Sequence, residues 1–503
     1  MLKKILAFTM ALGMLFSFTA CKNAEDDGSY YYETSTWEET VDNSEGESNN
    51  QNTENSSQGA TSNSNSGAAA NNSTAGAVTN NASKVDLSKL KLANKVTIKE
   101  GTSAVDANVN FGGKTITMAI TNEGQFHDAK FTRMVAAFEK KFNCKIKTTE
   151  LAFGTYNTQI QQALSAGTSY DICFQHYSMY PVGIKDGLYA DMSKVITTAD
   201  LQDPSNKSAG GIDLENSSYF AYGGKLYGLS HYYSEYPAVM YYNKKLCSAA
   251  GIDPLKLYNE GKWTWTTIAS LGKKVTNANK GVYFMNSTQP FTGEPNMDIV
   301  NGTPVCNVGS SKYIDALTQQ YKFSTGANQF MHWPYSVSEV QAKYDYFKSG
   351  KYYVLCEELV KWSQVAADAK SSTAFDKSLN NLGVVPVPTT GTSSYPFCGR
   401  RAVCAGVKSS DLRAAACWAK FEATYVDAVN DPATVVTGDI KKITDPLYEK
   451  THVSSFGCYY TSDNDTITYL FEMGVKVAQG GDIAQLVKQA KNYCDQAIKQ
   501  TWK

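Results

Sequence analysis

Two short stretches of the sequence bring aromatic, amide and imidazole side chains together. They are "TNEGQFHD" at residues 121–128 and "QHYSMY" at residues 175–180, and each follows an apolar run. Aromatic rings can stack on a small molecule, and amides and imidazoles can hydrogen-bond to it. We therefore expect these stretches to line a ligand site through six side chains: Gln125, Phe126, His127, Gln175, His176 and Tyr177.

The residues that could carry catalysis form no known motif. The chain has no GxSxG, HExxH or GxGxxG pattern and no phosphate-binding loop. Its five histidines lack metal-ligand spacing, and "SDNDT" at 462–466 lacks the glycine and distal glutamate of an EF-hand loop. We expect a binding protein that needs no catalytic residue, metal or cofactor. A glycoside-active enzyme stays open as an alternative, because Glu357 and Glu235 could act as acid and base.

The elements that position the first group of residues alternate between strand and helix. Residues 115–120, 144–151 and 170–174 have the pattern of strands, and residues 127–142 and 155–167 have helical spacing of apolar side chains. Such alternation builds a parallel sheet covered by helices. Ligands of these sheets gather at the carboxyl ends of the strands, which is where both polar stretches lie.

A second block of elements begins near Pro237. Residues 237–243 and 352–360 are predicted strands, and at least one of Tyr241 and Tyr242 should be packed as core. Asn243 is a candidate helix cap, and a helix is expected to begin at Thr264 or Thr266. Residues 380–397 are predicted to cross between blocks, followed by a strand at 401–407, a helix at 411–426 and a C-terminal amphipathic helix.

The first part of the chain indicates export and lipid anchoring. Lys3 and Lys4 precede an apolar run that is short for a transmembrane helix, so residues 1–20 are predicted to be a signal peptide. The run ends in "FTAC", which resembles a bacterial lipobox, and Cys21 is expected to carry acyl chains such as palmitate. Residues 21–110 are rich in Ser, Asn and Gly and acidic, which predicts a flexible tether.

Ten further cysteines lie in the rest of the chain, several of them in apolar runs such as "DICF" and "YVLC". They have no CxxC spacing and are typical of small buried side chains rather than of a disulfide framework. We expect mostly free thiols, and Cys398 with Cys404 is the first pair to test for a disulfide.

Seven segments in order resemble the family 1 extracellular solute-binding proteins, the lipoprotein receptors of bacterial ABC importers and distant relatives of maltose-binding protein. They include "QIQQALSAGTSYDICF", "YGGKLYGLSHYYSEYPAVMYYNKKLCSAAGIDP", "GKWTWTTIASLGKKVT" and "FKSGKYYVLCEELVKW". The resemblance implies an α/β fold of the periplasmic-binding-protein type II, a two-lobed clamshell in which each lobe is a mostly parallel sheet flanked by helices. It places lobe one at residues 111–235 plus 384–430, and lobe two at 236–383 plus 431–503.

The resemblance also extends the set of candidate solute contacts. Its first crossing between lobes falls in "SHYYSEY", which makes Tyr232, Tyr233 and Glu235 candidates. Further candidates are a tryptophan of the "KWTWTT" segment, a tryptophan in the loop "FMHWPYS", a glutamate after an apolar strand, and an arginine after the second crossing that could hold a uronate carboxylate. These four are Trp265, Trp333, Glu357 and Arg400.

The function that the resemblance implies is capture of a solute, a carbohydrate or oligosaccharide, and its delivery to ABC transporter permease subunits. The expected location is the extracellular side of the cell membrane, through the anchor on Cys21. A tethered sensor that partners a membrane kinase or chemoreceptor stays open as an alternative. The net charge of −1 and the lack of a Lys- or Arg-rich cluster exclude a typical nucleic-acid-binding protein. We expect a monomer.

Overall fold

The computed structural model describes a large part of the chain after residue 84. The described ranges are 85–176, 179–203, 210–232, 235–286, 297–300, 303–333, 342–388, 395–429, 431–433, 435–449, 452–454 and 465–502. The signal peptide, Cys21 and most of the predicted tether lie outside them. Within these ranges, no helix combines the length and the apolar character that crossing a membrane requires.

Lobe one is built on three parallel strands. In this sheet β1 (Thr115–Thr121) pairs with β2 (Lys145–Leu151) on one side and β3 (Ile172–His176) on the other. Helices α2 (Ala129–Phe142) and α3 (Tyr156–Ser165) connect them, so the predicted alternation is confirmed. Asp128 caps α2 by accepting the Phe131 N–H at 2.7 Å. The cap fixes the helix start directly after the polar stretch that follows β1.

Lobe two is built on strands of mixed direction. Its central strand β6 (Glu235–Asn243) pairs antiparallel with β11 (Tyr352–Glu358) and β12 (Leu382–Pro386). Farther out, β11 runs parallel to β7 (Tyr283–Asn286), which pairs with β10 (Met331–His332). Tyr241 and Tyr242 are both buried, as predicted for at least one of them. Gly383 makes room for Tyr242, because a Cβ at this position would lie 2.2 Å from the ring.

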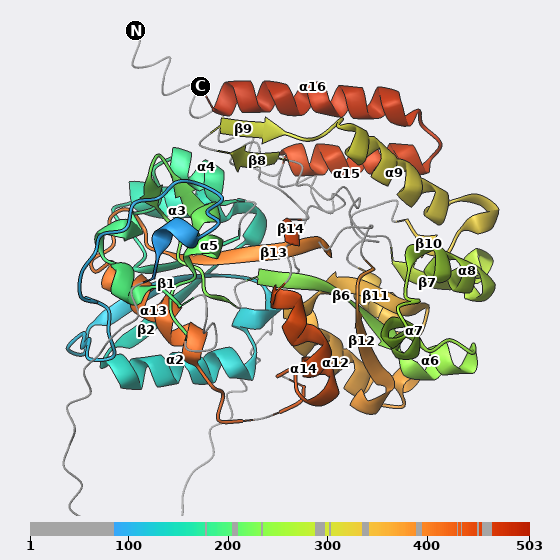
Figure 1. The fold of residues 1–503 in the computed structure, drawn as a ribbon, viewed down its shortest axis with the longest axis horizontal. Coiled ribbons are helices and arrows are strands. Elements are labelled where there is room, and N and C mark those ends of the chain that lie inside the picture. The colour runs from blue at the N-terminus through green and yellow to red at the C-terminus, as the bar shows by residue number, and fades with distance from the viewer. Residues whose placement is uncertain are drawn as a thin grey trace, which may run out of the picture. The chain divides into compact units, whose positions relative to one another are not determined.

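Strand β13 (Tyr395–Cys404) joins the two lobes into one sheet. Its residues 398–400 pair with β6, and residues 401–404 pair with β3. The described strands therefore follow the order β10-β7-β11-β6-β13-β3-β1-β2, with β12 beside β6 and β14 (His452–Ser454) beside β13 (Figure 1). The two connections predicted between the lobes thus lead into neighbouring antiparallel strands.

The predicted helix caps of lobe two are confirmed. Asn243 accepts the Leu246 N–H at the start of α6, and Thr264 accepts the Thr267 N–H at the start of α8. The remaining described helices and the hairpin strands complete the fold. They are α4 (Tyr180–Lys185), α5 (Leu214–Ser217), α6 (Lys244–Ala249), α7 (Pro254–Asn259), α8 (Trp265–Val275), α9 (Ser311–Ser324), α11 (Lys343–Lys348), α12 (Trp362–Ser371), α13 (Arg413–Thr424), α14 (Gly438–Thr444), α15 (Asp465–Ala478), α16 (Ile483–Thr501), β4 (Ala221–Tyr222), β5 (Lys225–Leu226), β8 (Met297–Val300) and β9 (Thr303–Cys306).

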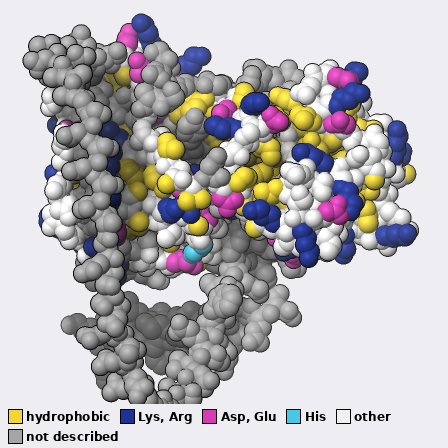
Figure 2. All heavy atoms as spheres, turned by 90° about the horizontal axis from the view of Figure 1, so that it is seen from below, with side chains coloured by type: hydrophobic (Ala, Val, Ile, Leu, Met, Phe, Trp, Pro, Cys, Tyr) yellow, Lys and Arg dark blue, Asp and Glu magenta, His cyan; other side chains and the backbone are white. Residues whose placement is uncertain are grey.

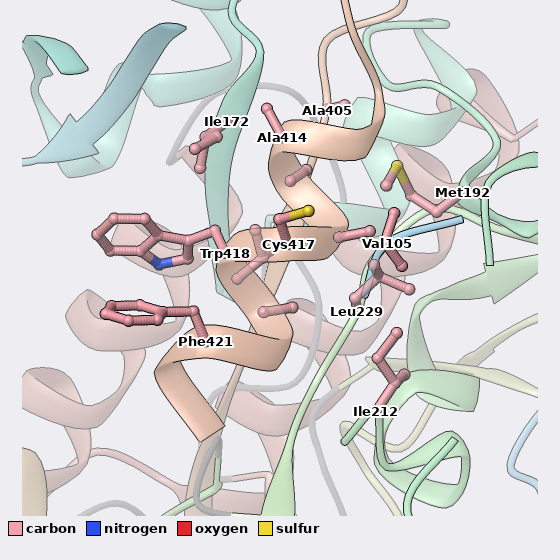
Figure 3. Packing of buried hydrophobic residues seen from close by; sticks show 14 of the residues in the cluster. Val105, Ile172, Met192, Ile212, Leu229, Ala405, Ala414, Cys417, Trp418 and Phe421 are labelled. Atoms are coloured by element: carbon pink, nitrogen blue, oxygen red, sulfur yellow. The ribbon is translucent and has the colours of Figure 1, made fainter. Parts of the chain in front are cut away.

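The core of lobe one forms around α13, which is apolar on almost every side. Ala414, Cys417 and Trp418 on this helix are fully buried (Figure 3). The Trp418 ring centroid lies 5.0 Å from that of Phe138 on α2 and 6.1 Å from that of Phe174 on β3. Small side chains allow α13 to approach the sheet closely, and the large ring fills the space between the helices. This packing holds β3 and β13 in place beneath the site described below.

The cysteines that the structure describes with their side chains are free thiols, as the sequence predicts, and all but Cys306 are buried. Burial raises the pKa of the Cys247 thiol to about 12 and that of Cys144 to about 11. Cys398 and Cys404 lie on the single strand β13, so their Cα atoms are about 20 Å apart at the rise of an extended chain. That separation excludes a disulfide between them.

The C-terminal helices α15 and α16 lie side by side (Figure 1) and contribute to a core that also contains residues of α4. Val487 and Cys494 of α16 share this cluster with Tyr180, and Lys185 Nζ lies 5.7 Å from the Trp502 ring centroid. The predicted apolar stripe of α16 is therefore core packing. The residue bounds predicted for the two lobes remain a prediction.

Candidate functional site

Polar side chains from both lobes meet where β1, β3 and β11 end. Glu123 follows β1, His176 is the last residue of β3, and Glu358 is the last residue of β11. Lys361, at the end of the 3-10 helix η11 (Leu359–Lys361), lies 3.6 Å from Glu123 across the lobes, measured from Nζ to Oε1. We call this group the charged cluster. Its members are Glu123, His176, Lys343, Glu357, Glu358 and Lys361.

Glu123 is the lobe-one carboxylate of the charged cluster. Its side chain is 18% exposed, and its Oε2 accepts a 2.8 Å hydrogen bond from the Thr121 hydroxyl. Burial alone would raise its pKa. The Lys361 ammonium and the Thr121 hydroxyl outweigh burial and lower the pKa below the ordinary value. Glu123 is therefore ionised at neutral pH and supplies a hydrogen-bond acceptor at the boundary between the lobes.

His176 is the neutral member of the charged cluster. Desolvation lowers its pKa to about 4, and Lys361 lowers it further, while Glu123 acts in the opposite direction. Its ring lies edge-on to Phe153, with 5.9 Å between the ring centroids. A neutral imidazole can both donate and accept hydrogen bonds, which suits a partner that carries hydroxyl groups.

Glu357 and Glu358 are adjacent carboxyl groups with different surroundings. Glu357 forms an ion pair with Lys343 and accepts hydrogen bonds of 3.0 Å from the Tyr344 hydroxyl and from the Glu358 N–H. Burial would raise the pKa of Glu357, but Lys343 and the hydrogen bond from the Glu358 N–H lower it. Burial and the neighbouring Glu357 charge raise the pKa of Glu358 to about 8. One carboxyl group is thus ionised, and the other holds a proton at neutral pH.

A second contact joins the lobes beside the charged cluster. The Ser363 hydroxyl on α12 lies 3.4 Å from Asp128 Oδ2, where Asp128 caps α2 of lobe one. The elements that carry Lys361 and Ser363 are consecutive, so lobe two meets the polar stretch after β1 along one continuous surface. This arrangement places hydrogen-bond donors and acceptors of the two lobes next to one another.

A separate buried ion pair lies beside the crossing strands. Arg401 on β13 pairs with Glu422 on α13, and His231 Nε2 lies 3.7 Å from Glu422 Oε2. Burial would raise the pKa of Glu422, but Arg401 and His231 hold it at about 2. The Arg401 guanidinium also lies 4.7 Å from the Phe174 ring centroid. This pair ties β13 to lobe one.

Several aromatic and amide candidates are occupied by core contacts. Phe126 is 4% exposed and packs on Phe131 and Phe174, at ring-centroid distances of 5.2 and 4.8 Å. Trp265 is 8% exposed and stacks on Phe323. The fully buried Gln175 amide donates to the Tyr189 hydroxyl inside lobe one. These contacts give the three side chains structural roles, and we leave them out of the proposed site.

Four other candidates lie at or near the surface or at the crossing. His127 is exposed and lies 3.3 Å from Glu150. Gln125 is half-buried and hydrogen bonds to Glu123 of the charged cluster. Tyr232 is buried beside Tyr448, with 5.9 Å between ring centroids. For Glu235 only the backbone is described, in β6 opposite Arg400.

Trp333 and Arg400 are buried and pack against side chains outside the charged cluster. Trp333 is 5% exposed and belongs to the core that includes Leu470 and Met473 of α15. The Arg400 guanidinium is stacked 4.0 Å from the Tyr219 ring centroid. The predictions for Tyr177, Tyr233 and Cys21 lie outside the described residues.

The structure therefore brings His176 and Glu357 together, with Gln125 close by. Sequence reasoning missed Glu123, Lys343 and Lys361 as site residues, and of the adjacent Glu357 and Glu358 it chose only Glu357. The polar stretch after β1 contains Glu123, and "EELVK" at residues 357–361, where β11 ends, contains Glu358 and Lys361. The rule that ligands bind at strand ends could have found these three. Lys343 has no such signal, because it lies on α11 and reaches Glu357 only through the fold.

Among the described residues, no three His, Cys, Asp or Glu side chains are grouped so that they could hold a metal ion. A cavity of about 220 Å³ lies between α2 and α13 of lobe one and shares no residue with the charged cluster. On the face shown in Figure 2, basic and acidic side chains are interspersed, so this face has no continuous basic surface.

The same fold occurs in solved sugar-binding receptors. An ABC substrate-binding protein from Listeria monocytogenes in complex with cycloalternan is 18% identical, has a TM-score of 0.59, and the match covers 77% of this chain and 99% of that one. The galacto-N-biose/lacto-N-biose I-binding protein from Bifidobacterium longum is 16% identical, with a TM-score of 0.55 and coverage of 78% and 98%. These likenesses confirm the two-lobed type II α/β fold.

A third structure, the extracellular solute-binding protein from Staphylococcus aureus in complex with maltose, is 15% identical with a TM-score of 0.53, and the match covers 76% of this chain and 98% of that one. No curated protein sequence matches the chain. The sequence profile described as bacterial extracellular solute-binding protein matches residues 133–429, which is more than half of the chain. The chain therefore belongs to the family of bacterial extracellular solute-binding proteins.

Proposed function

We propose that this protein is a lipid-anchored extracellular receptor that captures a carbohydrate or polyol between its lobes and delivers it to an ABC importer. The observation that carries the proposal is the charged cluster. It places neutral and ionised hydrogen-bonding side chains from both lobes at the carboxyl ends of β1, β3 and β11. Hydroxyl groups can both donate to and accept from such side chains.

The solved relatives support a hydroxyl-rich solute. Their complexes contain cycloalternan, lacto-N-biose and maltose, and a further relative from Agrobacterium vitis contains D-mannitol. These compounds are uncharged and carry many hydroxyl groups. We carry this chemistry over to the present chain because its cluster offers the matching donors and acceptors.

Binding would act through closure of the two lobes. The Lys361–Glu123 and Ser363–Asp128 contacts join the lobes, so a solute that adds hydrogen bonds to both lobes would favour the closed arrangement. A solute can shift the balance only by its preference for the closed over the open form. The closed receptor would then present a surface that permease subunits distinguish from the open one.

The anchor would keep the receptor next to its transporter. The "FTAC" sequence at Cys21 supports lipidation, and several acyl chains would hold the protein permanently at the membrane. Growing the source bacterium with labelled palmitate tests this proposal. We expect label in the wild-type protein and none in a Cys21→Ala variant, and labelling of both proteins would contradict the assignment.

A thermal-shift screen tests the solute class. The probes are maltotetraose, lacto-N-biose, D-mannitol and ribitol, beside amino acids and polyamines as other classes. A solute that binds only the folded receptor stabilises it by about 2.7 kcal/mol at 100 times its Kd, so at least one sugar or polyol should raise Tm by a few degrees. If only an amino acid or a polyamine raised Tm, the carbohydrate proposal would fall.

A matched pair of variants tests the location of the site. Lys361→Met removes a cluster ammonium, and Lys408→Met removes an exposed lysine that has no part in the cluster. We expect the sugar-induced rise in Tm to shrink in the first variant and to persist in the second. Equal rises in both would place the solute elsewhere.

A product assay tests whether the protein only binds. Overnight incubation with maltotetraose should leave its chromatographic profile unchanged while Tm rises. The appearance of shorter saccharides would establish glycoside cleavage and would overturn the assignment of a pure binding role.

A further inference from the structure

Glu358 is a buried acid whose side chain has an unsatisfied oxygen. The residue is 9% exposed, and among the described residues its Oε1 has no hydrogen-bond partner. An unsatisfied buried polar atom costs free energy, which a hydrogen bond to a bound solute would recover. Glu358 lies at the end of β11, within the charged cluster where the lobes meet.

Charged and titratable groups on every neighbouring element influence the Glu358 carboxyl. Glu357 on β11 and Glu123 after β1 oppose a negative charge there, whereas Lys361 on η11 and Lys343 on α11 favour one. Both lysines already have carboxylate partners, Glu123 for Lys361 and Glu357 for Lys343. The Tyr241 hydroxyl donates to the main-chain oxygen of Glu358, at 3.2 Å. A third negative charge would therefore lack a dedicated counterion.

We propose that Glu358 is a specificity-determining residue that keeps its proton and donates a hydrogen bond to an oxygen of the solute, so that the site selects uncharged, polyhydroxylated solutes over acidic sugars. The inference rests on the proposed function and deepens it. The pKa of about 8 agrees with the burial and the like-charge neighbour seen in the geometry. A protonated carboxyl group is a strong donor in a dry site.

The arginines at the crossing strands support the exclusion of acidic solutes. A uronate carboxylate is best held by a guanidinium group that faces it with two parallel N–H groups. The Arg401 guanidinium is engaged with Glu422, and that of Arg400 is stacked on Tyr219. An acidic solute in the charged cluster would instead meet Glu123 and Glu357, both ionised.

Calorimetric titration across pH tests the proposal. The neutral probe is whichever of maltotetraose, lacto-N-biose and D-mannitol raises Tm most, and the acidic probes are digalacturonate and D-gluconate. For the wild-type receptor, Kd should rise about tenfold between pH 7 and pH 9, as the protonated fraction of Glu358 falls. In Glu358→Gln the amide still donates and does not titrate, so Kd should be near the wild-type value at pH 7 and constant to pH 9.

Two further variants complete the experiment. Glu358→Leu should bind the neutral probe about tenfold more weakly at every pH, because the donor is lost. Glu472→Gln, an exposed position on α15, should keep the wild-type profile. A wild-type Kd that does not change with pH, or tighter binding of an acidic probe, would overturn the proposal while leaving solute capture intact. If none of the neutral probes bound, both this proposal and the proposed function would be overturned.

Discussion

Glu422 on α13 and Glu358 at the end of β11 are both largely buried glutamates, yet the protein shifts their pKa values in opposite directions. Arg401 and His231 face Glu422 and hold its pKa at about 2, whereas Glu358 has the ionised Glu357 beside it and a pKa of about 8. Burial is common to both residues. The difference comes from the sign of the nearest charge.

This difference indicates which buried carboxyl is structural and which is functional. Glu422 has a counterion from the same lobe, so its charge is satisfied whether or not a solute is bound. Each of the two glutamates has one side-chain oxygen without a hydrogen-bond partner among the described residues, but the main charged neighbour of Glu358 is another carboxylate, and Glu358 lies where the two lobes meet. Strongly perturbed acids in such positions are candidates for functional sites.

The largest expected effect comes from breaking the structural pair. Arg401→Met leaves Glu422 buried without its main counterion, and loss of one partner of a buried pair typically costs about 3–5 kcal/mol. Urea denaturation at pH 7 measures the change in unfolding free energy. Arg413→Met is the matched control, because Arg413 is 44% exposed in its pair with Asp411 and should lose less than about 1 kcal/mol. Equal losses in the two variants would remove the distinction between these pairs.

The next effect is a change in the pH dependence of stability, with opposite signs for the two glutamates. Because the pKa of Glu358 is raised in the folded protein, Glu358 contributes to folding stability below about pH 4.5, and this contribution is lost as pH rises toward 8. The unfolding free energy of Glu358→Gln should therefore rise relative to that of the wild type, by up to about 1.4 kcal/mol for each pH unit across this window. The lowered pKa of Glu422 gives a contribution that is present above about pH 4.5 and lost as pH falls toward 2. Denaturation curves at pH 5, 6.5 and 8 compare Glu358→Gln with the wild type, and parallel curves would contradict the assignment.

Much of the fold could be predicted from the sequence because its signals are local. Strand and helix alternation predicts β1, α2, β2, α3 and β3, and hydrogen-bonding side chains mark the starts of α6 and α8 at Asn243 and Thr264. The pairing of β13 with both β3 and β6 has no local signal. It depends on side chains brought together from distant parts of the chain.

The site could be predicted only in part, because residue type does not determine where a side chain points. The strand-end rule identified His176, and the family resemblance led to Glu357. Aromatic character led to Phe126 and Trp265, whose rings are packed in the cores of the two lobes. An aromatic residue that contacts a ligand and one that packs in the core look the same in the sequence, and only burial in the structure distinguishes them. Lys343 gave no signal, because it lies on α11 and reaches Glu357 only through the fold.

A smaller effect is expected from removing the charge that joins the lobes. Lys361→Met deprives Glu123 of its cross-lobe partner, but the lobes can then separate and return Glu123 to water. We therefore expect a loss near 1 kcal/mol rather than the cost of a permanently buried charge. Small-angle scattering without solute should show a larger radius of gyration than for Lys408→Met. An unchanged radius would mean that the pair does not hold the lobes together.

The smallest effect is expected at His127, which provides a solvent-exposed counterpart to the buried pairs. His127 Nε2 lies 3.3 Å from Glu150, and both side chains are more than a third exposed. Water screens such a pair, so His127→Ala should change the unfolding free energy by less than about 0.5 kcal/mol. Because its ring lies outside the charged cluster, we also expect an unchanged Kd for the sugar that gives the largest thermal shift.

His176→Ala removes a neutral donor and acceptor from the charged cluster and should weaken binding of that sugar about tenfold. Calorimetry on the two variants shows whether the solute binds at the charged cluster or near His127. Weaker binding by His127→Ala alone would assign the site to the end of the polar stretch that follows β1.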